Sequence, residues 1–102
     1  MASRRRIAWT PEARRTLDEI LDFVAHDSPE GARRVLEEVL TAARSLETLS
    51  ERGRIVPELE DSSVREVFVY RYRLMYRVEG ETVSIVAILH GARDFERWRS
   101  EP

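Results

Sequence analysis

The side chains best suited to chemistry in this sequence are three arginines in its C-terminal third. Arg73 and Arg77 are four residues apart in a segment rich in apolar residues, and Arg93 follows the next such segment. Guanidinium groups stay charged and hold phosphate or carboxylate through two parallel hydrogen bonds. These arginines are therefore candidates for a shared anion site. The alternative is that nearby acidic residues, Glu66 first among them, pair with them at the surface, where an ion pair contributes about 0–1 kcal/mol.

The two histidines are candidates for proton transfer because the ordinary pKa of histidine is close to neutral pH. His90 ends a predicted strand, on the sheet face that also holds Arg73, and is a candidate acid–base group with a structural role as the alternative. His26 lies at the end of a predicted helix, where imidazolium complements the helix dipole, so we expect it to cap the helix or face solvent. Asp94 either pairs with an arginine, as Glu96 could, or caps the last helix.

Most known site signatures are absent from the sequence. It contains no Walker loop, no glycine-rich dinucleotide turn, no paired-histidine metal spacing and no nucleophile elbow. It also contains no cysteine, which excludes disulfides, thiol catalysis and thiolate metal sites. We therefore expect neither a bound metal nor a cofactor.

Length and composition predict a single domain over residues 1–102. With 42% hydrophobic and 35% charged residues, the chain is typical of a soluble globular protein. No apolar run approaches the roughly 20 residues of a membrane-spanning helix. Because no apolar signal-peptide core follows the arginines at 4–6 and cysteine is absent, we expect a cytoplasmic protein that does not bind membranes.

The charge pattern argues against a broad nucleic-acid-binding surface. All 17 basic residues are arginine, and the formal net charge is −2. A nucleic-acid-binding domain usually has a pI above about 9, whereas the pI here is about 5.7. The acidic excess lies in residues 10–61, which hold 13 acidic residues against 7 arginines.

Two helix start signals occupy the first half of the chain, after a short predicted strand at 4–9. The segments TPE at 10–12 and SPE at 28–30 each offer a hydroxyl for the N-cap, then proline, then an acid. Apolar residues then recur every three or four positions, which predicts one helix over about 11–26 and a second that keeps the pattern as far as Leu49. Because their connection is short, the two helices should form an antiparallel hairpin.

After a polar loop over 51–63, the hydrophobic period changes to two. Two-residue turns at 70–71 and 80–81 give three antiparallel strands in a single register. One face of these strands is then apolar and should meet the helical hairpin; its residues are Val67, Val69, Tyr72, Leu74, Tyr76, Val78, Val83, Ile85, Ala87 and Leu89.

The opposite face of these strands mixes charged with apolar residues. It should hold Glu66, Phe68, Arg73, Met75, Arg77, Ser84, Val86, Ile88 and His90. So many apolar residues predict that this face is half covered, either by the C-terminal segment or by a partner. That segment should form a short helix over 92–99, in which Phe95 and Trp98 dock together. The expected fold is α+β, a helical hairpin packed on one face of a small, mainly antiparallel sheet.

The segment YRLMYRV at 72–78, preceded by VREV at 64–67 and followed by ILHGARD at 88–94, resembles the RelE/ParE superfamily of bacterial toxins from type II toxin–antitoxin pairs. The resemblance spans nearly the whole chain, because the expected order β-α-α-β-β-β-α is also that family's plan. It implies a small toxin that is encoded with a cognate antitoxin and neutralised by it in a hetero-oligomeric complex.

The resemblance implies two alternative activities. RelE-like members are ribosome-dependent mRNA endoribonucleases, and their motif would put Arg73 and Arg93 on the phosphate and His90 in the acid–base position. This sequence departs from them, since it has no lysine and no tyrosine or histidine after Arg93. ParE-like members inhibit DNA gyrase through protein contacts and lack the full nuclease set. The acidic hairpin and the incomplete site favour the ParE-like activity.

We expect the antitoxin or the target to contact the mixed sheet face and the last helix. Apolar side chains interleaved with arginines suit an amphipathic, acidic segment that folds on binding. The candidate contact residues are Glu66, Phe68, Arg73, Met75, Arg77, Arg93, Arg97 and Trp98.

Overall fold

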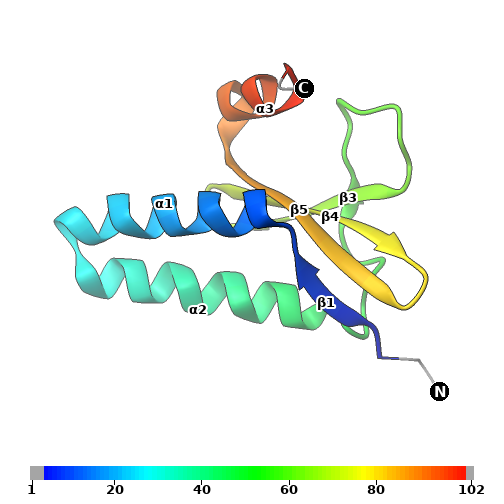
Figure 1. The fold of residues 1–102 in the computed structure, drawn as a ribbon, viewed down its shortest axis with the longest axis horizontal. Helices are drawn as coiled ribbons and strands as arrows, with labels where there is room; N and C mark the ends of the chain where they lie inside the picture. Colours follow the sequence, from blue (N-terminus) through cyan, green and yellow to red (C-terminus); the bar gives the residue numbers. More distant parts are fainter. Residues whose placement is uncertain (1–3, 101–102) are drawn as a thin grey trace.

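A computed structural model describes residues 4–100 of the chain, with the side chains of Ala92 and Arg93 outside the description. Three helices pack on a mixed five-stranded sheet, so the fold is α+β as predicted. Figure 1 shows the two long helices side by side, with the third beyond the end of the last strand. The elements are β1 (Arg6–Trp9), α1 (Pro11–Asp27), α2 (Pro29–Ser45), β2 (Arg54–Ile55), β3 (Val64–Val69), β4 (Tyr72–Glu79), β5 (Thr82–His90) and α3 (Gly91–Ser100).

The strands lie in the order β1-β5-β4-β3-β2. Strands β3, β4 and β5 form the predicted antiparallel meander, joined at residues 70–71 and 80–81. The first turn holds Tyr70 at φ 54°, a left-handed conformation that costs a non-glycine residue about 1–2 kcal/mol. Strand β1 forms one edge of the sheet and runs parallel to β5, so the first and last strands of the chain are neighbours.

Both predicted helix starts are confirmed. The Thr10 hydroxyl accepts the N–H of Ala13 at 3.1 Å, and the Ser28 hydroxyl accepts that of Gly31 at 2.9 Å. The second helix ends at Ser45, short of the predicted Leu49. After Ser45 the backbone continues in tighter turns, in which the N–H groups of Leu46 and Glu47 bond the carbonyl oxygens three residues earlier. Leu49 is 58% exposed, so it keeps the helical spacing but does not pack in the core. No helix in residues 4–100 is long and apolar enough to cross a lipid bilayer.

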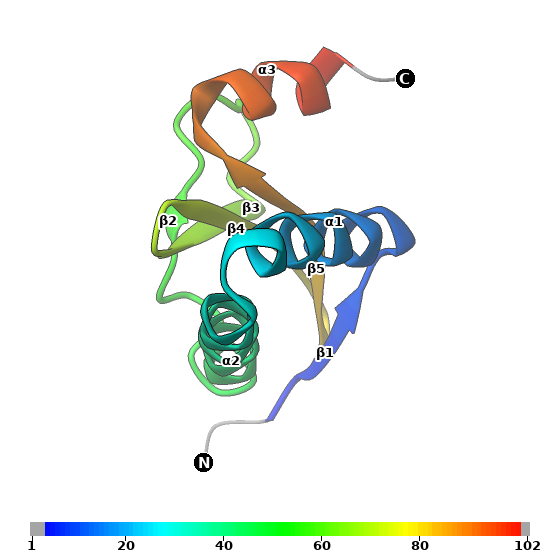
Figure 2. The same ribbon diagram turned by 90° about the vertical axis from the view of Figure 1, so that its left-hand side faces the viewer.

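Each face of the sheet packs against its own apolar cluster. In Figure 2, α1 and α2 lie next to each other and α3 lies apart from them. The hairpin-side cluster, between the sheet and α1 and α2, includes Leu17, Val39, Leu46, Leu74, Tyr76 and Ile85. The α3-side cluster consists of Val56, Val64, Met75, Ala87, Leu89 and Phe95, with Leu59, Val86 and Trp98 partly buried against it. The C-terminal segment therefore covers much of the mixed face. This was one of the two alternatives that the sequence left open, the other being a partner.

A β-bulge in β5 interrupts the predicted single register. Met75 pairs with Ala87, whereas the next residue, Tyr76, pairs with Ile85. Val86 is thus an extra residue that has no pairing partner on β4. One inserted residue inverts the alternation of side chains between the two faces for the rest of the strand.

The predicted facing of β5 is consequently correct as far as Ile85 and wrong from Ala87 onward. Leu89, expected to face the helical hairpin, joins the α3-side cluster together with Ala87. Ile88, expected on the mixed face, is fully buried in the hairpin-side cluster.

The hydroxyl of Tyr76 ties the loop after α2 to the sheet. It donates to the carbonyl oxygen of Ser50 at 2.8 Å and accepts the N–H of Gly53 at 2.9 Å. Burial of this phenol raises its pKa. The loop then forms the two-residue strand β2, which pairs with Arg65 and Glu66 and which the sequence pattern did not predict.

Replacing Tyr76→Phe should lower the free energy of unfolding by about 1–3 kcal/mol, because a buried N–H and a buried carbonyl each lose their partner. Urea denaturation followed by circular dichroism measures the change. Tyr70→Phe is the matched control: its ring is 61% exposed, and the same substitution there should change stability by less than about 0.5 kcal/mol. Equal effects of the two substitutions would contradict the assigned role of the Tyr76 hydroxyl.

Candidate functional site

Arg73 is the centre of a charge network beneath α3. Its Nε donates to Oε1 of Glu66 at 2.6 Å, and its two terminal nitrogens donate to the two carboxylate oxygens of Glu58 at 2.9 and 2.7 Å. Arg54, in β2, donates to the other oxygen of Glu66 at 2.7 Å. Two arginines and two glutamates therefore balance one another, and Glu58 occupies the two-pronged face with which a guanidinium binds phosphate.

The sheet register positions this network. Glu66 pairs with Met75 and Phe68 pairs with Arg73 across β3 and β4, which places Glu66 diagonal to Arg73 on the α3 side, as the sequence predicted. Glu58 comes from the loop between β2 and β3. It is the partner that sequence reasoning missed, and no periodic signal marks it because it lies outside the strands.

The members of the network lie at different depths. The side chains of Glu66 and Arg73 are 0% and 7% exposed, whereas those of Glu58 and Arg54 are 35% and 57% exposed. The hydrogen bonds that Arg73 donates to Glu58 raise the pKa of Arg73 above its ordinary value and lower the pKa of Glu58. The guanidinium of Arg73 also lies 4.9 Å from the ring centroid of Phe95, a cation–π contact.

Arg77 does not join Arg73. Its guanidinium donates to Asp61 at 3.2 Å and to the hydroxyl of Ser63 at 2.9 Å. This is a surface ion pair whose two side chains are both more than one-third exposed, with Asp61 in place of the expected Glu66. Hydrogen bonds from Ser63 are the main cause that lowers the pKa of Asp61. Arg93 belongs to α3, but its side chain lies outside the described part of the structure.

His90 lies away from Arg73, contrary to the expectation that they share a face. Its ring packs against Tyr72, with centroids 5.4 Å apart, at the end of a hollow that Ile20 and Phe23 also line. The bulge in β5 is the reason, because it inverts the strand's facing before His90. The backbone N–H of His90 donates to Asp94 at 3.2 Å. Asp94 lies in the first turn of α3 and holds the residue that precedes the helix, so it is not the N-cap residue that the capping alternative predicted.

Three of the eight candidate contact residues are covered by the chain itself. Glu66, Arg73 and Met75 are 1%, 6% and 0% exposed, so they offer little surface to a partner in this state. Phe68 is 55% exposed, and the Arg54 guanidinium lies 5.1 Å from the centroid of its ring. Contact of the exposed candidates with a partner stays a prediction.

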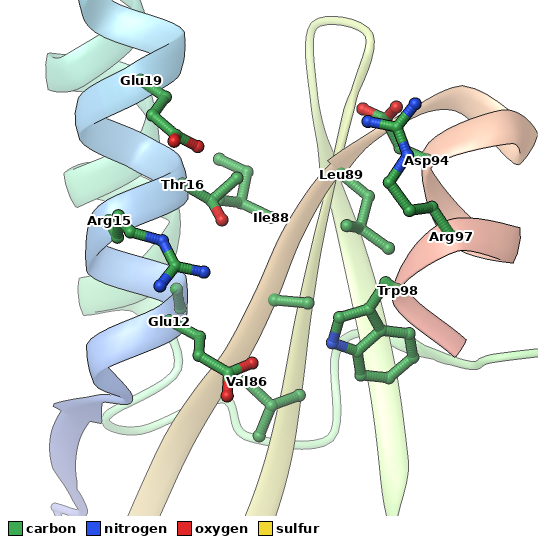
Figure 3. Close-up of a pocket in the computed structure, with 12 residues that line it drawn as sticks. Glu12, Arg15, Thr16, Glu19, Val86, Ile88, Leu89, Asp94, Arg97 and Trp98 are labelled. Carbon is green, nitrogen blue, oxygen red and sulfur yellow. The ribbon is translucent and has the colours of Figure 1, made fainter. Parts of the chain in front are cut away.

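A groove of about 240 Å³ runs between α1 and α3 over β5. Figure 3 shows α1 on one side, α3 on the other and β5 between them. Apolar residues of β5, among them Val86 and Leu89, form its floor, and Arg97 and Trp98 line its α3 side. Its α1 side is formed by Glu12, Ala13, Arg15, Thr16 and Glu19. Sequence reasoning included Arg97 and Trp98 but missed the α1 side, whose polar residues look like any solvent-facing helix surface.

The described residues do not form a cluster of metal-ligating side chains. Over residues 4–100, apart from the side chains of 92 and 93, no group of three or more histidine, aspartate or glutamate side chains is arranged to hold a metal ion.

Comparison with known proteins identifies relatives across nearly all of this fold. Residues 7–95 match the family described as the ParE toxin of the type II toxin–antitoxin system parDE. Toxin RelE2 of Caulobacter vibrioides is 39% identical over 88 residues, which cover 85% of this chain and 96% of that protein.

Two solved structures are similar in fold. The chromosomal ParDE toxin–antitoxin system of P. aeruginosa contains a chain that matches with a TM-score of 0.71 at 24% identity, covering 86% of this chain and 97% of that one. The RelBE2 toxin–antitoxin complex of Mycobacterium tuberculosis gives a TM-score of 0.59 at 25% identity, covering 88% and 94%. By its fold, its motif strands and the family match over residues 7–95, this chain belongs to the ParE toxin family of type II toxin–antitoxin systems, within the RelE/ParE superfamily.

Proposed function

We propose that this toxin arrests growth by inhibiting DNA gyrase through protein contacts and that a cognate antitoxin neutralises it. The observation that carries the proposal is the occupied guanidinium of Arg73. Glu58 and Glu66 neutralise the arginine that an RNA-cleaving member would direct at a phosphate. A neutralised guanidinium gives little stabilisation to the charge that develops during phosphate cleavage.

The surroundings of Arg73 also lack a proton carrier suited to neutral pH. Among the described residues its polar and aromatic contacts are two carboxylates and the ring of Phe95, and His90 packs on the other side of the sheet. General acid–base catalysis requires a group within hydrogen-bond reach of the reacting atoms whose pKa is near the working pH. Protein contact therefore accounts for this site better than RNA chemistry does.

The groove between α1 and α3 is our candidate surface for the antitoxin. An apolar floor on β5 with charged residues along both sides suits an amphipathic helix that lays its apolar face into the groove. The exposed ring of Phe23, 79% accessible, extends the apolar surface beyond the end of the groove. An antitoxin segment that folds on this surface would bury both.

A supercoiling assay tests the gyrase proposal. Purified toxin should reduce gyrase-catalysed supercoiling of a relaxed plasmid in a dose-dependent manner, and pre-mixing with equimolar antitoxin should restore it. Toxin that has been heat-unfolded and shown by circular dichroism to remain unfolded serves as the control preparation. Supercoiling that is unchanged over a wide range of toxin concentrations would refute the proposal.

The second candidate function is ribosome-dependent cleavage of mRNA, which the 39% identity to a protein named toxin RelE2 favours. In that case mRNA should be cut only when ribosomes are present, and the same toxin preparation should leave gyrase active. The two assays run in parallel therefore separate the candidates. Cleavage of mRNA without ribosomes would count against this candidate, and so would a complete lack of cleavage in their presence.

A further inference from the structure

We propose that the outer side of Arg73 is a carboxylate-binding site, which Glu58 occupies in the free chain and which an acidic side chain of a partner protein takes over in the complex. The proposal rests on the proposed function, in that it requires the partner to be a protein. It assigns to Glu58 the role of an internal stand-in for a partner's aspartate or glutamate.

The two carboxylates that hold Arg73 are not equivalent. Glu66 is fully buried within β3 and bridges two arginines, Arg54 and Arg73. Glu58 comes from a loop, its side chain is 35% exposed, and its two oxygens both accept from Arg73. Glu66 is therefore part of the interior, whereas Glu58 can leave toward solvent by rotating its own side chain.

The charge balance shows what would remain after Glu58 leaves. Arg54, Glu66 and Arg73 together carry one net positive charge, centred on a guanidinium that is 7% exposed. A buried charge without a partner is strongly unfavourable, so another anion should enter. The site accepts a carboxylate in a two-pronged geometry, because it already holds one at 2.7 and 2.9 Å.

The surrounding loop allows this exchange without unfolding. Val56, two residues before Glu58, is fully buried in the α3-side cluster, and Leu59 is partly buried against it. The backbone on either side of Glu58 is thus anchored, and only the side chain has to move. The ring of Phe95 keeps the Arg73 guanidinium in place from the other direction.

A titration with propionate, a side-chain analogue of glutamate, tests the proposal. The NMR signal of the Arg73 Nε–H group is followed in the wild type, in Glu58→Ala and in Glu60→Ala, at constant ionic strength. Glu60→Ala is the matched control, because it removes the same charge from an exposed position in the same loop. If Glu58 fills the site in at least nine molecules of ten, its removal should lower the apparent Kd for propionate about tenfold or more. Wild type and Glu60→Ala should agree with each other.

Two results would overturn the proposal. One is a folded Glu58→Ala variant whose Arg73 signal responds to propionate no more than that of Glu60→Ala. The other is tighter binding of inorganic phosphate than of propionate, which would assign the site to phosphate. If Glu58→Ala does not fold, Glu58→Gln decides in its place, since it keeps the side-chain length and loses the charge. Neither gyrase nor antitoxin is present in this titration, so its outcome is separate from that of the supercoiling assay.

Discussion

Arg73→Ala should be the most damaging single polar substitution in this toxin, lowering the free energy of unfolding by about 3–5 kcal/mol. The substitution removes the only described partner of Glu58 and one of the two arginines that hold Glu66. Glu66 is fully buried, so its carboxylate would be left undercompensated in the interior. A loss of that size is a large part of the 5–15 kcal/mol that stabilises a typical small protein.

Arg77→Ala is the matched control for this prediction. Arg77 lies in the same strand, but its side chain and that of its partner Asp61 are both more than one-third exposed, so its removal should affect stability far less. Urea denaturation of both variants provides the comparison. An Arg73→Ala variant as stable as Arg77→Ala would show that the buried network does not support the fold.

This prediction bears on how activity data for Arg73 should be interpreted. A loss of toxicity in Arg73→Ala would be expected whether or not Arg73 contacts a target, because less folded protein would be present. Activity should therefore be compared at equal concentrations of folded protein, measured by circular dichroism.

Phe95→Ala should be comparably destabilising, by about 3–5 kcal/mol. The ring is 1% exposed in the α3-side cluster and contacts both the Arg73 guanidinium and Trp98, whose ring centroid is 5.8 Å away. Its removal leaves a cavity between α3 and the sheet and takes away the main apolar anchor of the helix. Thermal unfolding should report the loss, and a red shift of tryptophan emission should report new exposure of Trp98.

Phe68→Ala controls for the loss of a phenyl ring. Phe68 is 55% exposed, so this substitution should change the free energy of unfolding by less than about 0.5 kcal/mol. If Phe95→Ala cost no more than Phe68→Ala, α3 would not be held by the contact described above. The groove between α1 and α3 would then lack a fixed wall, and our assignment of the antitoxin surface would fail with it.

The helical hairpin was predictable from the sequence because its determinants are local. Each helix is started by a hydroxyl that caps an N–H three residues later and by a proline that has no N–H to lose. The apolar spacing then decides which side faces the sheet. The end of α2 was predicted less well, since Leu49 keeps the spacing but lies in a turn where its side chain is exposed.

The facing of the last strand was predictable only in part. Alternation placed Val83 and Ile85 correctly on the hairpin side, but it could not locate the bulge at Val86. Both faces of β5 carry apolar residues, so either register beyond Ile85 satisfies the hydrophobic pattern. Contacts with α1 on one side and α3 on the other select between them, and α1 lies more than 50 residues before β5 in the chain.

The sequence by itself determined that Arg73 lies in a strand, diagonal to Glu66, in a chain of the RelE/ParE type. Only the tertiary structure decided that this arginine is buried and that carboxylates balance its charge. The deciding partner, Glu58, lies 15 residues away in a loop, where neither periodicity nor propensity predicts the direction of a side chain. Burial under Phe95 then makes the pairing necessary, because a guanidinium removed from water must be matched by nearby negative charge.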